Sequence, residues 1–191
     1  MEILNKKLIL ASKSPRRSQL LAAAGFTFEI RTKEVEENYP DDLAAEEVAP
    51  YLAEKKAMEC AEFLTNEDDI LLASDCIVVF EGEIYGKPKN KEEAMQILKV
   101  LSGNVHQVIT GVCLLSKQKK KIFSAVSKVH FQEISEEEID YYLEKYQPYD
   151  KAGAYAIQEW IGLCKISKIE GTYSNIMGLP MEAVYRELLS F

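Results

Sequence analysis

The sequence predicts an α/β fold built around a mixed β-sheet. Segments of strand length that are rich in Ile, Leu and Val alternate with segments whose apolar residues recur at helical spacing. Two pairs of neighbouring strands are joined by turns short enough for hairpins, which excludes an all-parallel sheet. The chain has 191 residues, enough for one sizeable core or for two lobes that share a sheet. We therefore expect a single domain spanning residues 1–191.

The first third of the chain predicts two strands and two helices. Gly25 is expected to end the first helix, and Pro50 to interrupt the second near its first turns. The predicted elements are a buried strand at 7–12, a helix at 15–24, a strand at 26–31, a loop at 32–42 and a helix at about 45–63.

The middle third predicts two hairpins separated by a helix. Ser135 and Glu138 have the spacing of a capping box, so a helix is expected to begin there. The predicted elements are a buried strand at 70–80, a short strand ending at 86–88, a helix at 91–101, antiparallel strands at 105–116 and 121–132, and a helix reaching residue 145.

The last third predicts a loop, a strand and a helix. Gly and Ala residues predict an open loop from Asp150 to Gly162, and a strand is expected at 163–169. Pro180 suits the start of a final helix, because its fixed φ matches the first helical position.

Composition excludes several classes of function. A formal charge of −8 argues against binding nucleic acid polymers through their phosphates, although a local cationic pocket for a small anion is compatible with it. The apolar runs are shorter than the roughly 20 residues of a membrane helix. The N-terminus also lacks the pattern of a secretory signal, so we expect a cytoplasmic protein that does not bind membranes.

Cysteine and histidine usage predicts neither disulfides nor zinc. The four cysteines are dispersed without a CxxC pair, and His106 and His130, expected on strand surfaces, have no zinc-like spacing. A metal would have to bind carboxylates and substrate oxygens, as Mg²⁺ or Mn²⁺ does.

The segment Ser12-Lys-Ser-Pro-Arg-Arg17 predicts an anion site. Ser14 is expected as the N-cap and Pro15 as the first residue of a helix, so backbone N–H groups and the positive end of the dipole point at the end of the preceding strand. Two hydroxyls and the guanidiniums of Arg16 and Arg17 add donors that suit phosphate oxygens. Taken alone, an ordinary Ser-Pro cap followed by solvated arginines is an equal alternative.

Asp75 is a second candidate, because it interrupts a buried apolar strand. A carboxylate there costs several kcal/mol unless it is paired, hydrogen-bonded or bound to a metal, so its surroundings must supply a partner. A satisfied structural aspartate is the alternative.

The Ser12–Arg17 segment resembles the N-terminal signature of the Maf family of nucleotide pyrophosphatases. The family's other motifs follow in order over about nine-tenths of the chain, which makes the resemblance specific although each motif alone is weak. These motifs are Glu36-Glu37, Lys56-Ala57, Ser74-Asp75, Gly86-Lys87-Pro88, Leu101-Ser102-Gly103, the segment from Asp150 to Gln158 and the segment from Gly171 to Pro180.

The resemblance implies a fold, a reaction and a role for each candidate residue. The implied fold is an elongated mixed sheet with flanking helices that form two lobes around a central cleft, as in Maf and ITPase-like proteins. The implied reaction is metal-assisted attack of water on the α-phosphate of a nucleoside triphosphate, and a homodimer is also implied. The roles are proton acceptor for Asp75, metal ligand for Asp75 and for Glu37, and substrate binding for Ser12, Ser14, Arg16, Arg17, Lys56 and Lys87.

Residues of the dTTP/UTP branch of the family point to a pyrimidine substrate. That branch resembles this chain in Arg16 and in Gln158, whose amide can pair with the carbonyl and N–H on one edge of uracil or thymine. Cytosine inverts this pattern, so the surroundings of Gln158 must fix the amide. Cys76 stands where this branch usually has Thr, and Ser74 where it usually has Ala, which leaves tolerance of modified pyrimidines open.

Two other functions stay open at this stage. A nucleotide-binding regulator of septum formation would need Arg16, Arg17 and Gln158 but not Asp75. A 7-methyl-GTP pyrophosphatase of the same family is the other alternative, against which Arg16 and Gln158 both argue.

Overall fold

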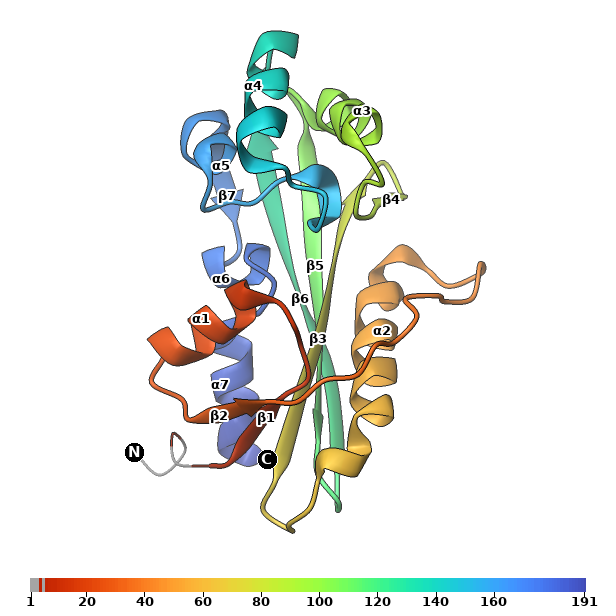
Figure 1. The fold of residues 1–191 in the computed structure, drawn as a ribbon, viewed down its shortest axis with the longest axis vertical. Coiled ribbons are helices and arrows are strands. Elements are labelled where there is room, and N and C mark those ends of the chain that lie inside the picture. The colour runs from red at the N-terminus through yellow and green to blue at the C-terminus, as the bar shows by residue number, and fades with distance from the viewer. Residues whose placement is uncertain (1–3, 5) are drawn as a thin grey trace. The chain divides into compact units, whose positions relative to one another are not determined.

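The computed structural model describes Leu4 and residues 6–191, and it confirms an α/β fold with a mixed sheet flanked by helices (Figure 1). The sheet has the order β2-β1-β3-β5-β6-β7, with β4 paired to β3. β1 is parallel to both β2 and β3, whereas β4 is antiparallel to β3 and β7 to β6. The strands are β1 Leu8–Leu10, β2 Phe28–Ile30, β3 Ile70–Phe80, β4 Glu83–Tyr85, β5 Val105–Leu115, β6 Lys120–Phe131 and β7 Ile166–Glu170.

Most helices begin where the sequence predicts them. Ser135 and Glu138 form the expected capping box at the start of α4. The helices are α1 Pro15–Ala23, α2 Ala45–Glu59, α3 Lys91–Leu101, α4 Glu136–Tyr146, α5 Trp160–Lys165, α6 Tyr173–Ile176 and α7 Met181–Ser190, with 3₁₀ turns η2 Ala61–Phe63 and η3 Ala152–Ala154.

The start of the strand predicted at 163–169 was wrong, because residues up to Lys165 belong to α5 and β7 begins at Ile166. A Cβ on Gly162 would lie 1.9 Å from the carbonyl oxygen of Ile157. Only glycine permits this contact between α5 and the preceding segment, and apolar periodicity does not report it. The short helix α6 was not predicted either.

Pro50 does not interrupt α2, which runs from Ala45 to Glu59 with the proline inside it. The Ala49–Pro50 backbone packs directly on Gly111 of β5, where a Cβ would lie 2.3 Å from the backbone nitrogen of Pro50. This close packing of helix on strand offsets the cost of the backbone hydrogen bond that proline cannot donate.

The chain divides into two compact units, each described here by itself. Unit 1 comprises residues 1–75, 110–125 and 178–191, and unit 2 comprises residues 76–109 and 126–177. The strands β3, β5 and β6 contribute residues to both. Whether the whole chain behaves as one domain stays a prediction.

Unit 1 is a layered core centred on β1. Leu8 and Leu10 pack on one face against residues of α1 and α7. Ile9 and Ala11 pack on the other face against residues of α2. β1 is therefore buried on both faces, as the uninterrupted apolar run predicted.

Unit 2 has a separate core formed by α3, α4, η3 and their neighbouring strands. Tyr142 and Leu143 of α4 are fully buried in it, together with Leu98 and Leu101 of α3. No helix among the described residues is long and apolar enough to cross a membrane.

Asp69, in the turn before β3, makes the stability of unit 1 depend on pH in the acidic range. Burial alone would raise the pKa of its carboxyl, but hydrogen bonds from Asn66 and Thr65 outweigh burial and lower this pKa to about 2 from the ordinary 3.8. The backbone N–H groups of Thr65 and Asn66 donate to Oδ2 at 2.9 and 2.8 Å. The ionised carboxylate thus stabilises the fold above about pH 4.

We expect Asp69→Ala to lower the free energy of unfolding by about 2 kcal/mol at pH 7, because it removes the hydrogen bonds that these N–H groups donate to a charged carboxylate. The difference from the parent should shrink as pH falls from about 4 towards about 2, where the parent's carboxylate becomes protonated. Urea unfolding at several pH values measures this, with the exposed Asp68→Ala as control. A constant difference across that range would contradict the assignment.

Candidate active site

The carboxyl end of β1 and the neighbouring middle part of β3 form a topological switch point in unit 1. β1 is followed by α1 and its parallel neighbour β2, and the chain then crosses by α2 to β3 on the other side of β1. The two helices pack on opposite faces of the sheet. Ligands of α/β proteins bind at the carboxyl ends of the strands where the order reverses in this way. Ser12 and Asp75 both lie at this edge of unit 1.

Ser12 and Arg17 form a hydrogen-bonded corner at the end of β1. The buried Ser12 hydroxyl accepts hydrogen bonds from the Ser14 N–H at 3.2 Å and from Nη1 of Arg17 at 3.0 Å. Nε of Arg17 donates to the Gly178 carbonyl at 2.8 Å, and the Ser74 hydroxyl donates to the same oxygen at 3.1 Å. Arg17 is therefore fixed between the first strand and the segment that leads into α7.

The start of α1 has the predicted geometry with one difference. Ser14 is the N-cap in extended conformation and Pro15 is at N1, as expected, but the Ser14 hydroxyl makes no capping hydrogen bond. The Arg16 side chain is half-buried in the same turn. The first turn thus keeps backbone donors and a positive dipole end that can bind an anion.

The Lys56 ammonium forms ion pairs with the two carboxylates that the sequence suggested as site residues. Its ammonium lies 2.5 Å from Oδ1 of Asp75 and 2.7 Å from Oε1 of Glu37. Asp75 is only 7% exposed, so this ion pair supplies the partner that a buried strand carboxylate requires. The Lys56 side chain is only 15% exposed, so it is not a solvated lysine on the helix surface.

The two clusters lie on opposite faces of the strands at this edge. Ser12 and Ser74 continue the face of Leu10 and Leu72, which packs against α1 and α7. Asp75 points to the other face, where α2 carries Lys56. The switch point thus has a donor-rich face and a carboxylate–ammonium face.

The predicted residues of unit 2 lie on connected segments. The N–H of Gly153 donates to the carbonyl of Gly86 at 3.1 Å, which joins the segment of Lys87 to the loop that leads to Gln158. Cys76 of β3 is partly buried and packs against the unit 2 core, which also contains Tyr155. Lys87 is exposed, and its role stays a prediction.

Gln158 lies in a tight turn and has an unmatched acceptor. The Glu159 N–H donates to the Ala156 carbonyl at 3.1 Å, so Ile157 and Gln158 are the central residues. The Oε1 atom of Gln158 is buried and has no hydrogen-bond partner within the described chain. A buried acceptor without a donor costs about 1–3 kcal/mol, which a ligand N–H would remove.

His106, expected on a strand surface, is buried. Val105 and Gln107 are exposed on β5, so His106 shares the inward face with Val108, and that alternation was the signal that could have revealed it. Nε2 of His106 lies 2.8 Å from the hydroxyl of Tyr155. Burial lowers the pKa of His106 to about 4, so the imidazole is neutral near pH 7.

The carboxylates fit a divalent cation bound together with substrate. Glu37 and Asp75 approach one ammonium, so both can approach one cation. The described residues contain no group of three or more His, Cys, Asp or Glu side chains that could hold a metal by themselves. Two carboxylates completed by phosphate oxygens are the donor set that Mg²⁺ uses in nucleotide enzymes.

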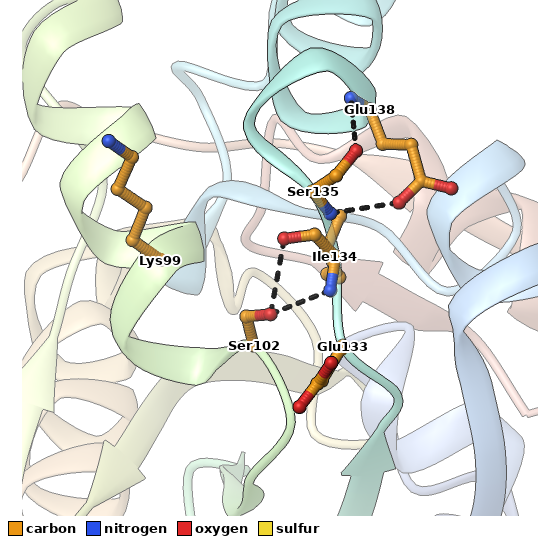
Figure 2. Close-up of a pocket in the computed structure, with 6 residues that line it drawn as sticks. All are labelled: Lys99, Ser102, Glu133, Ile134, Ser135 and Glu138. Atoms are coloured by element: carbon orange, nitrogen blue, oxygen red, sulfur yellow. Dashed lines mark hydrogen bonds between the residues drawn. The ribbon is translucent and has the colours of Figure 1, made fainter.

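A pocket of about 460 Å³ in unit 2 is lined by none of the predicted site residues, although Ser102 belongs to a family motif (Figure 2). The Ser102 hydroxyl accepts from the Ile134 N–H at 2.7 Å, and Ser135 and Glu138 of the capping box line the same pocket. These groups bond to one another, so the pocket is not a candidate site.

Comparisons with known proteins agree with the motifs. The chain matches the family model described as Maf-like protein over residues 7–191. A protein of Phocaeicola vulgatus named dTTP/UTP pyrophosphatase is 49% identical, with 95% of this chain and 94% of that protein covered. A protein of Flavobacterium johnsoniae with the same name is 48% identical, with 95% and 93% covered.

Among solved structures, the Staphylococcus aureus Ham1 protein is similar with a TM-score of 0.48 and 16% identity. The similarity covers 66% of this chain and 72% of that one. A similarity at this level indicates nothing about the function of the chain.

Proposed function

The chain belongs to the Maf family, and on that premise we propose that it is a hydrolase that converts dTTP and UTP to the nucleoside monophosphate and pyrophosphate. The observation that carries the proposal is the contact of Lys56 with both Asp75 and Glu37, beside the carboxyl end of β1. It combines a carboxylate for activating water with cations for phosphate, which phosphoanhydride hydrolysis needs.

The triphosphate is bound by donors of the first turn of α1. Backbone N–H groups there, the Ser12 and Ser14 hydroxyls and the Arg16 guanidinium supply hydrogen bonds and positive charge. Ser12 and Gly178 hold the Arg17 side chain in place, so this side chain loses little conformational entropy when it binds a phosphate. Lys56 and Lys87 are proposed to offset charge that develops on the leaving pyrophosphate.

Asp75 is proposed as the group that orients and deprotonates the attacking water. The water oxygen forms a bond to the α-phosphorus, the bond from that phosphorus to the α,β-bridging oxygen breaks, and Asp75 accepts the proton. The electron pair of the broken bond leaves with pyrophosphate. A divalent cation held by Glu37, Asp75 and substrate oxygens, Mg²⁺ or Mn²⁺, would supply charge that polarises the phosphoryl group.

Gln158 is proposed to read the base. Its buried, unmatched Oε1 can accept the N3–H of uracil or thymine, and its amide N–H can donate to a neighbouring carbonyl. Cytosine has an acceptor at the same ring position, so it would leave Oε1 unmatched. Arg16 and Cys76 are the other proposed specificity residues, with Cys76 replacing the hydroxyl usual in this branch.

The remaining expectations follow the same proposal. We propose a cytoplasmic protein that acts on the nucleotide pool and forms a homodimer. A regulator of septum formation and a 7-methyl-GTP pyrophosphatase stay as alternatives, and neither is favoured by the names of the relatives above.

A substrate panel tests the proposal. Pyrophosphate release is measured from dTTP, UTP, CTP, GTP and 7-methyl-GTP with Mg²⁺ or Mn²⁺. We expect dTTP and UTP to be hydrolysed with kcat/KM at least about tenfold above CTP, since one mismatched hydrogen-bonding group costs about 1.4 kcal/mol or more. Equal rates on all five nucleotides would remove the role of Gln158, and a preference for 7-methyl-GTP would favour the other branch.

A further inference from the structure

The turn that carries Gln158 is held on both sides by one hydroxyl. The Tyr142 hydroxyl accepts a hydrogen bond from the Ala156 N–H at 3.1 Å and donates one to Oε2 of Glu159. Ala156 and Glu159 are the first and last residues of the turn. A single atom of α4 therefore fixes the turn before and after the residue proposed to read the base.

Tyr142 is well placed to hold the turn rigidly. It is fully buried in the core of unit 2, and its ring stacks on Tyr146 with centroids 5.0 Å apart. Burial, reinforced by the hydrogen bond to Glu159, raises the pKa of its hydroxyl far above the ordinary value of 10. The hydroxyl thus stays protonated and remains a donor near pH 7.

Glu159 is held from a second direction. Its side chain is 18% exposed, and Nζ of Lys151 lies 3.6 Å from Oε1 while also pairing with Asp150 at 2.7 Å. The ammonium balances the charge of the largely buried carboxylate, which leaves Oε2 to accept from Tyr142.

The third restraint comes from α5. The backbone of Ile157 packs on Gly162, where a Cβ would lie 2.4 Å from the Ile157 carbonyl carbon. The turn is thus enclosed by α4, by the Lys151 side chain and by the first turns of α5. None of these contacts uses the Gln158 amide.

We propose that Tyr142, acting with Glu159, is a positioning residue that fixes the Gln158 turn and thereby sets discrimination against cytosine. This inference rests on the proposed function. If the turn could shift, the Gln158 side chain could move to a position from which its N–H₂ pairs with cytosine. A turn fixed at both ends holds the Gln158 backbone in place, so the amide meets the base from one direction and a base with an N–H opposite Oε1 is bound best.

The test compares kcat and KM for UTP and CTP in Tyr142→Phe, which keeps the ring and removes both hydrogen bonds. We expect the UTP/CTP ratio of kcat/KM to fall about threefold to tenfold, as one or two lost hydrogen bonds imply. The loss should lie in KM for UTP with kcat nearly unchanged, because the base is remote from the reacting phosphorus. General destabilisation would lower the active fraction for both substrates and leave the ratio unchanged.

Three variants complete the design. Tyr141→Phe is the matched control, because the Tyr141 hydroxyl accepts from Lys145 instead of from the turn, and it should keep the parent ratio. Glu159→Ala removes the acceptor without opening the core and should lower the ratio, whereas Glu159→Gln keeps an acceptor oxygen and should restore it. This pair tests the proposal even if Tyr142→Phe folds poorly.

Gln158→Ala separates the failure of this inference from that of the proposed function. If Gln158→Ala lowers the UTP/CTP ratio while Tyr142→Phe and Glu159→Ala keep the parent value, the positioning role is overturned and base reading by Gln158 stands. If Gln158→Ala also keeps the parent UTP/CTP ratio, both the positioning role of Tyr142 and base reading by Gln158 are overturned. A parent that releases no pyrophosphate from UTP overturns the proposed function itself.

Discussion

Replacing Asp75 by asparagine is expected to lower kcat/KM for dTTP and UTP by about 10²–10⁴-fold, the range for losing a positioned general base. Asparagine has nearly the same shape and can still accept a hydrogen bond from Lys56, which lies 2.5 Å from Oδ1 in the parent. What is lost is the ability to accept the proton of the attacking water. The effect should therefore appear in kcat, with the affinity for nucleotide largely retained.

Pyrophosphate release and nucleotide binding by calorimetry together measure this effect. Asp41→Asn, in the exposed loop before α2, makes the same chemical change away from the site and should keep full activity. An Asp75→Asn variant that hydrolyses dTTP and UTP as fast as the parent would refute the catalytic role. If both parent and variant bind nucleotide without hydrolysing it, the regulator alternative would be favoured.

Lys56→Met is expected to give the largest loss of stability together with a loss of activity. It leaves the Asp75 carboxylate, 7% exposed, without the ammonium that now lies beside it. Removing one partner of such a buried pair costs about 3 kcal/mol, which for a chain of this length lowers the Tm by about 6–12 °C. Glu37 contributes less to the loss, because its side chain is 40% exposed and water can solvate it.

A double-mutant cycle isolates the pair. Thermal unfolding of Lys56→Met in the Asp75→Asn background should show a clearly smaller loss than in the parent, because no carboxylate is left without its partner. Lys55→Met is the control. Lys55 is one position before Lys56 on α2, and its ammonium contacts the exposed Asn38. Equal losses in the two backgrounds would mean that the stability effect of Lys56 does not act through Asp75.

Elements that local pattern specifies were predictable from the sequence. The eleven-residue apolar run of β3 and the amphipathic α3 have the bounds that their periodicity predicts. The same holds for the start of α4, because the capping box of Ser135 and Glu138 involves residues only three positions apart. The start of α1 followed from Ser14 and Pro15, since an N-cap and a proline act within one turn.

Features that depend on contacts between distant segments were not predictable in this way. The sequence required a partner for Asp75 but did not identify it, and the family resemblance implied only substrate binding for Lys56; the pairing comes from the structure. Residues 160–165 form a helix because Gly162 lets the Ile157 backbone approach, and no periodicity records that contact. The burial of His106 was likewise missed: its spacing from Val108 indicated the face, but the rings that cover it, Phe131 and Tyr155, come from distant segments.

The sequence by itself thus determined the α/β class and most element starts, and through ordered motifs it predicted the residues proposed for the site. Only the tertiary structure decided which of them meet: Lys56 with Asp75 and Glu37, Arg17 with Ser12 and Gly178, and Tyr142 with both ends of the Gln158 turn. The physical reason is the sequence separation over which each interaction acts. Capping and periodicity act over a few residues, whereas Arg17 and Gly178 are 161 positions apart and meet only when the layers of unit 1 pack.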